Sequence, residues 1–156
     1  MFSNNINLEY YSVLYNLGVV YSLLGRCVNP QDPDLEELKL KDAIKDLQYA
    51  GWIFDKIRQA VPGCLSQKEI SPDMTTHNLS FNSNLNLAWA QLYILELASK
   101  KNMDKNLQSQ LAKGCYDLFT AVYNISKDAL QKFFNEETRI YLNNRRFYYF
   151  GLCHYL

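Results

Sequence analysis

The sequence lacks an excess of charge of either sign. Its 16 basic and 16 acidic side chains give a net charge of zero over 156 residues. Proteins that bind nucleic acid or an anionic membrane through their overall charge carry a basic excess. We therefore expect no nucleic-acid partner, and any charged site must lie in a local patch.

The sequence is also poor in the residues that build common catalytic and metal sites. It has two histidines, His77 and His154, and no C-x-x-C pair. Neighbouring side chains on a helix diverge by about 100°. Cys153 and His154 therefore do not chelate one ion easily, and core packing explains them better. For the same reason Glu136 and Glu137 do not converge for acid-base chemistry.

Sequence motifs for phosphate binding, zinc proteolysis and serine hydrolysis are absent from the chain. Together with the scarcity of metal ligands, this predicts a protein that is not an enzyme. We expect no catalytic residue, no metal and no cofactor.

Long apolar runs are missing too. Runs such as residues 92–95 are far shorter than the roughly 20 residues that cross a bilayer. The four cysteines each lie in or beside an apolar helical segment, which is typical of buried, reduced thiols in the cytoplasm. These are Cys27, Cys64, Cys115 and Cys153. We expect a cytoplasmic protein.

Proline and glycine are sparse, and the segments between them have the apolar spacing of helices. The first helix covers residues 8–25. Asp32 is expected to cap the second helix with Pro33 at its first position, and Pro62 is expected to end it. The stretch Ser71-Pro72-Asp73 is expected to start the third helix in the same way, with a hydroxyl cap.

The second half of the chain is also predicted to be helical. The third helix carries two apolar stripes, which predicts that it is sandwiched between neighbours. A break near Asn102 leads to a fourth helix, and Ser126 is expected to cap a fifth that begins at about Lys127. Alternating apolar and polar residues are absent, so no strand is expected. The predicted fold is all-α, made of antiparallel helical hairpins.

One glycine in the first helix suggests where two helices meet. Gly18 lies in mid-helix, where glycine costs roughly 1 kcal/mol against alanine, so close packing is the expected reason for it. Spacing like that of the tetratricopeptide motif is found at Leu17, Gly18, Tyr21, Gly25, Ala43, Leu47 and Ala50. Residues 26–42 interrupt the repeat of about 34 residues, so a plain tetratricopeptide array is not expected.

Four motifs in order resemble the Bro domain, the helical module of ALIX-type adaptors. They are Ser12 to Ser22, Ala43 to Phe54, the I-S-P-D of residues 70–73 and the L-A-W-A-Q of residues 87–91. The resemblance implies a tetratricopeptide-like helical core. A complete Bro domain is much longer, with helices and a small sheet before these motifs and further helices after them. Residues 1–156 therefore resemble the central portion of that domain.

The sequence also departs from the family pattern. The segment between Pro72 and Leu87 is longer than in the family. Trp89 and Leu92 replace polar residues of the family motif.

The resemblance implies a binding function. Bro domains bind the amphipathic C-terminal helix of ESCRT-III subunits during multivesicular body formation and membrane scission. Family matching through residues 87–119 puts the three anchors of this site at Ile94, Leu107 and Leu111. A hairpin that turns near residue 102 would place Ile94 beside Leu111, with Leu107 one helical turn away. The alternative is that these three side chains are only hairpin core.

Three further expectations concern other partners and the location of the protein. A tetratricopeptide-like scaffold with unrelated protein partners is the alternative to ESCRT-III binding. A basic and aromatic cluster at Arg139, Arg145 and Arg146 suggests a peripheral membrane contact, although a solvated face backed by packed aromatic rings explains it better. The Bro resemblance implies a cytoplasmic protein recruited to endosomes.

The first helix is the last candidate surface. In a full domain it would be covered by preceding segments, so part of its apolar surface should be exposed here or paired with a second copy of the chain. The residues concerned are Tyr10, Leu14, Leu17 and Tyr21.

Overall fold

The computed structural model describes residues 6–66, 68–128 and 135–156. Within these ranges the chain is all-α, as predicted, and contains no strand. Its elements are α1 (Ile6–Arg26), α2 (Glu37–Cys64), the short 3-10 helix η1 (Pro72–Met74), α3 (Thr76–Lys100), α4 (Lys105–Asp128) and α5 (Glu136–Tyr155).

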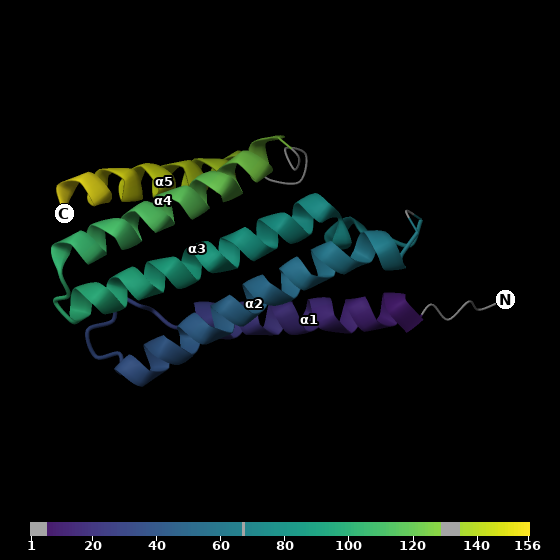
Figure 1. Ribbon diagram of the computed structural model, residues 1–156, viewed down its shortest axis with the longest axis horizontal. Coiled ribbons are helices and arrows are strands. Elements are labelled where there is room, and N and C mark those ends of the chain that lie inside the picture. Colours follow the sequence, from purple (N-terminus) through teal and green to yellow (C-terminus); the bar gives the residue numbers. More distant parts are fainter. Residues whose placement is uncertain (1–5, 67, 129–134) are drawn as a thin grey trace.

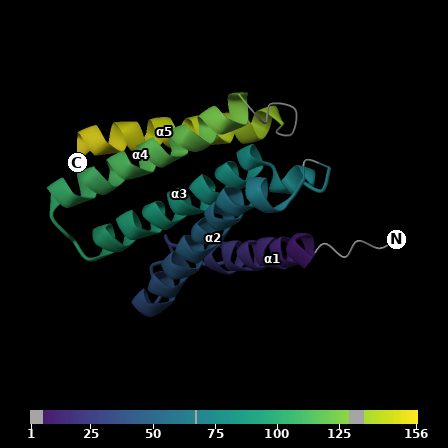
Figure 2. The same ribbon diagram turned by 45° about the vertical axis from the view of Figure 1, so that its right-hand side comes forward.

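Each helix packs mainly against the helices next to it in the chain. Figure 1 shows α2, α3 and α4 running beside one another with alternating direction, α1 along α2 and α5 along α4. The turned view in Figure 2 keeps the same order. The predicted antiparallel helical hairpins are therefore confirmed.

The core has two parts. One contains buried side chains of α2, α3, α4 and α5, among them Leu47, Ala88 and Phe119. The other lies where α1 packs on the second half of α2, around Phe54 and Ile57. Because α3 lies between α2 and α4, the predicted sandwiched position of this helix is confirmed.

Glycines mark the α1–α2 contact, as expected from the sequence. A Cβ atom on Gly18 would lie 3.1 Å from side-chain carbons of Ile53 and Phe54. A Cβ on Gly25 would lie 2.9 Å from the backbone oxygen of Ala43. Only hydrogen at these positions lets the two helices approach so closely.

Two predicted boundaries of the second helix are wrong. The helix begins at Glu37, and the Asp32 side chain instead accepts a hydrogen bond from the backbone N–H of Asp34 at 3.0 Å in a turn. At the other end, α2 continues through Pro62 to Cys64. Proline is tolerated there because it removes only one hydrogen bond from a helix about to end.

The predicted starts of the third and fifth helices also need correction. Residues Pro72–Met74 form η1, and Thr75 caps α3 by accepting from Asn78 N–H at 3.4 Å. Ser126 is buried inside α4, where its hydroxyl donates to the Tyr123 carbonyl. The cap of α5 is Asn135, and part of the segment predicted to begin this helix lies outside the described residues. Serine hydroxyls can bond within a helix as well as cap one.

The cysteines are not all buried, contrary to the prediction. Cys115 is fully buried and Cys153 is partly buried, whereas Cys27 and Cys64 are exposed beside helix ends. All four are free thiols. Burial raises the pKa of the Cys115 thiol to about 12.

Candidate partner-binding site

The turn between α3 and α4 sets the neighbours of the three predicted anchors. Asn102 adopts a left-handed conformation with φ 50°, and Met103 N–H bonds back to the carbonyl of Ala98. Asp104 then accepts from the backbone N–H groups of Asn106 and Leu107 at 3.0 and 3.3 Å. Leu107 therefore lies in the capped first turn of α4.

One close contact fixes the register of this hairpin. The Gln91 side chain lies where a Cβ of Gly114 would be, and its amide donates to the Leu111 carbonyl at 3.2 Å. Three residues closer to the turn on each helix, this register places Ile94 opposite Leu111. The structure thus brings these two predicted anchors together.

The three anchors differ in exposure. Ile94 and Leu111 are partly buried and pack against the core, whereas the Leu107 side chain is 40% exposed. Their side chains therefore present apolar surface to solvent at the hairpin end. Whether this surface binds a partner stays a prediction.

Another set of contacts fixes how α3 is aligned with α2. The Ser83 hydroxyl donates to the Gly51 carbonyl at 2.9 Å, and a Cβ on Gly51 would lie 2.9 Å from Leu87 Cγ. At the other end of the pair, Lys101 Nζ lies 2.7 Å from Glu37 Oε1. The helices α2 and α3 therefore run side by side over several turns.

One face of α3 stays open between these neighbours. Its residues recur every three or four positions and are all partly exposed, whereas Phe81, Ala88, Leu92 and Leu95 on the other side are buried. We call this the open face of α3. It consists of Ser80, Asn84, Leu87, Gln91 and Ile94.

An open groove of about 510 Å³ lies along this face, between α2 and α3. It is lined by Gln48, Gly51, Trp52, Asp55, Arg58, Ser80, Ser83, Asn84 and Leu87. The sequence patterns did not predict this groove. The one residue that could have indicated it is Trp52, a large apolar residue outside the buried stripe of α2.

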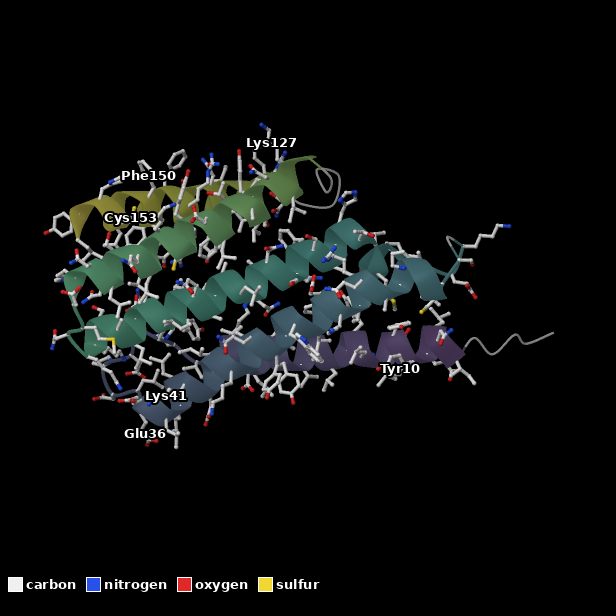
Figure 3. The ribbon with its side chains drawn as sticks, in the orientation of Figure 1. Tyr10, Glu36, Lys41, Lys127, Phe150 and Cys153 are labelled. Carbon is white, nitrogen blue, oxygen red and sulfur yellow. The ribbon has the colours of Figure 1, made fainter. Side chains whose placement is uncertain are left out.

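Charged groups close the end of the open face near the anchors. The Glu37 carboxylate lies between the ammonium groups of Lys101 and Lys41, and Lys41 is labelled in Figure 3 on the first turns of α2. Hydrogen bonds from Lys101 and then from Lys41 hold the pKa of Glu37 below its ordinary value. These ion pairs tie the start of α2 to the end of α3.

The opposite side of α3 is covered by side chains of other segments. The Trp89 ring has the guanidinium groups of Arg26 at 5.6 Å and Arg145 at 5.7 Å. Tyr93 is 2% exposed and donates from its hydroxyl to the Val28 carbonyl at 2.8 Å. We call Trp89 and Tyr93 the covered face of α3. It is part of the packing of the molecule.

Two arginines of the basic and aromatic cluster of α5 contact aromatic side chains in the same way, whereas Nε of Arg139 is buried without a hydrogen-bond partner among the described residues. Arg145 donates to the Tyr141 hydroxyl at 3.1 Å, and Arg146 lies 4.2 Å from the ring centroid of Tyr123. Guanidinium groups stacked on rings are partly withdrawn from solvent. The geometry therefore fits the packed interpretation of this cluster.

Metal and membrane-spanning features are absent from the part of the chain that the structure describes. The described residues contain no cluster of three potential metal ligands. His77 and His154 are both exposed, so the core packing predicted for His154 is wrong, whereas Cys153 is partly buried against the core. The His154 ring contacts Phe150 edge-on, with ring centroids 4.8 Å apart. Among the described helices, none is long and apolar enough to cross a membrane.

With this geometry established, the chain can be compared with known proteins. A family model described as the BRO1-like domain matches residues 1–156. This chain belongs to the BRO1-like domain family. The family resemblance found in the four sequence motifs is therefore confirmed. Among curated proteins, no sequence matches the chain.

Two solved structures share the fold of this BRO1-like chain. The BRO1 domain of ALIX in complex with CHMP4C matches 94% of this chain with a TM-score of 0.84 and 22% identity. ALIX in complex with a late-domain peptide of SIVmac239 matches 89% with a TM-score of 0.79 and 23% identity. The chain spans 39% of the first of these chains and 19% of the second.

Proposed function

We propose that this BRO1-like chain is a protein-interaction module of the ALIX type, without enzymatic activity, that binds the amphipathic C-terminal helix of an ESCRT-III subunit. The observation that carries the proposal is the apolar patch on one open surface, where Ile94 lies opposite Leu111 and Leu107 is exposed one turn away. An amphipathic helix docks on such a surface through a few apolar side chains. The CHMP4C complex of ALIX supports a partner of this class.

The charges beside the patch refine the chemistry of the ligand. The Glu37 network and the Asp104 carboxylate beside Leu107 put charges of both signs at the hairpin end. A ligand helix with charged residues of both signs flanking its apolar stripe would be complementary to them. Titration with a synthetic peptide of the CHMP4C C-terminal helix tests the proposal directly, and absence of binding at millimolar peptide concentration would contradict it.

The cellular role follows from this function. A module of this class would act in endosomal sorting, multivesicular body formation and membrane scission, as a cytoplasmic protein recruited to endosomes. Residues 1–156 would be the central part of a longer Bro domain, which fits their coverage of 39% of the ALIX BRO1 chain. An open reading frame upstream of Met1 that encodes further Bro helices would test the latter point.

A second candidate function is self-association through α1. The outer side of α1 carries an exposed apolar stripe with the alternating three- and four-residue spacing of a helix-packing seam. It consists of Ile6, Tyr10, Val13, Leu17, Val20 and Leu24. Tyr10 is labelled in Figure 3, whereas Leu14 and Tyr21 pack partly into the core. Sedimentation of the Val13→Glu protein beside the unmodified chain would reveal pairing along this stripe.

Two weaker alternatives are tested by the same preparation. A scaffold with unrelated partners would leave the CHMP4C peptide unbound. A peripheral membrane contact at the α5 cluster would give salt-sensitive binding to vesicles of anionic lipid, lost when Arg145 and Arg146 are changed to glutamine.

A further inference from the structure

We infer that the groove between α2 and α3 is a second half of the partner-binding surface, occupied by the continuation of the same ligand helix, with Trp52 as its anchor. This inference rests on the proposed function. It extends the contact beyond the three anchors at the hairpin end and assigns Trp52 a binding role.

The two halves lie on one helix face. Leu87 lines the groove, and Ile94 begins the anchor patch seven residues later on the open face of α3. Seven residues are two helical turns, or about 10 Å. A ligand helix lying along α3 with apolar residues seven positions apart would therefore contact both.

The connection between the halves is rigid. Gln91 lies between Leu87 and Ile94 on the open face, and its amide is bonded to the Leu111 carbonyl at 3.2 Å. The Gln91 side chain fills the space beside Gly114, so it cannot swing out without losing this contact. Gln91 is thus a fixed part of the open face between the groove and the anchor patch.

Trp52 has the chemistry and position of an anchor. Its side chain is 56% exposed at the edge of the 510 Å³ groove, and the Lys56 ammonium lies 5.6 Å from its ring centroid. Next to it, Gly51 has no side chain, which leaves room for Leu87 to lie against α2. Tryptophan is among the residue types that most often dominate binding energy at interfaces.

The remaining lining selects the kind of ligand. Asp55 accepts from both Nε and an Nη of Arg58, at 2.8 and 2.7 Å, so the pair satisfies itself. Gln48 and Asn84 contribute neutral amides. An apolar ligand side chain over Trp52 and Leu87 with neutral polar neighbours fits this half, in contrast to the charged end near Lys101.

The test uses the full chain labelled with fluorotryptophan and the CHMP4C C-terminal helix peptide. The chain has two tryptophans, so fluorine NMR gives one signal for each, and the Trp52→Ala protein assigns them. Peptide should shift the Trp52 signal and leave the Trp89 signal in place. Trp52→Ala should lower peptide affinity about tenfold or more.

The matched control is Tyr10→Ala, an aromatic side chain of similar exposure at 59% on α1, which should bind like the unmodified chain. Unchanged affinity of Trp52→Ala with an unmoved Trp52 signal overturns this inference, while loss of binding in Leu107→Asp would still support the proposed function. If the unmodified chain does not bind the peptide, the proposed function itself fails, and normal binding by Leu107→Asp would show that the anchors lie elsewhere. An effect of both variants supports the two together.

Discussion

The two tryptophans of this chain lie in opposite settings. Trp89 belongs to the covered face of α3, between two arginines and against the rings of Tyr93 and Phe119. Trp52 lies at the rim of the groove, where more than half of the residue is exposed to solvent and one lysine lies beside its ring. The comparison separates residues that hold the fold from residues available to a partner.

The largest effect is expected on the covered side. Trp89→Ala should lower the free energy of unfolding by about 3 kcal/mol, near the lower end for tryptophan because the ring is only partly buried. Urea denaturation measures this. Trp52→Ala should cost less than about 1 kcal/mol, and equal losses in the two proteins would break the comparison.

The second effect concerns binding. Leu107→Asp removes the burial of an aliphatic side chain and asks a carboxylate to lose water, so we expect a loss of roughly 2 to 4 kcal/mol, or about 30-fold to 1000-fold in affinity for the CHMP4C peptide. The fold should survive because an acid is tolerated in the first turn of a helix. Calorimetric titration beside a melting curve measures both.

Ile6→Asp is the control for this variant, since it also places an acid in the first turn of a helix at an exposed aliphatic residue. It should bind normally. Early melting of Leu107→Asp would show that Leu107 belongs to the core, and normal binding would show that the anchors lie elsewhere.

Glycines sharpen the same distinction between covered and open surface. Gly25→Ala should destabilise the protein by about 1 to 2 kcal/mol, because the new Cβ would press on the backbone oxygen of Ala43 and overpacking outweighs the helix propensity of alanine. Gly151→Ala should stabilise the protein by up to about 1 kcal/mol, since the new Cβ would meet no atom of another segment within 4 Å. Thermal melting distinguishes them, and a shift in the same direction for both would count against close packing at Gly25.

The smallest effect on stability is expected from the loss of a single hydrogen bond. Tyr93→Phe leaves the Val28 carbonyl without the hydroxyl that now bonds it at 2.8 Å, and should cost about 1 kcal/mol in urea denaturation. The exposed Tyr148→Phe should change stability by less than about 0.5 kcal/mol. Indistinguishable stabilities would show that water replaces the hydroxyl at Val28.

The sequence predicted the helices and their order well, because amphipathic spacing and the glycines of α1 follow directly from packing. It misplaced boundaries where a local signal had two possible outcomes. Pro62 could end a helix or sit in its last turn, and Ser126 could cap a helix or bond within one. Such choices are decided by neighbouring segments that a local pattern does not contain.

The candidate site was only partly predictable. Ile94 and Leu111 could be paired from the turn alone, since a hairpin fixes the distance of each residue from the turn. The groove beside Trp52 could not, because it depends on the register between α2 and α3, which Gly51 and Ser83 set over 32 positions of sequence. When a long segment connects two helices, the sequence alone does not show how the helices are aligned with each other.

The arrangement of helices, in which each packs mainly on its neighbours in the chain, has a consequence for local opening. Stability in such an array is close to a sum of nearest-neighbour terms, so opening of one end does not require the other to open. Amide hydrogen exchange should be slower in α2, α3 and α4, each of which has a helix packed on either side, and faster in α1 and α5. The helix that carries the open face would then be among the best protected elements of the molecule, and a ligand would dock on a platform that is already rigid.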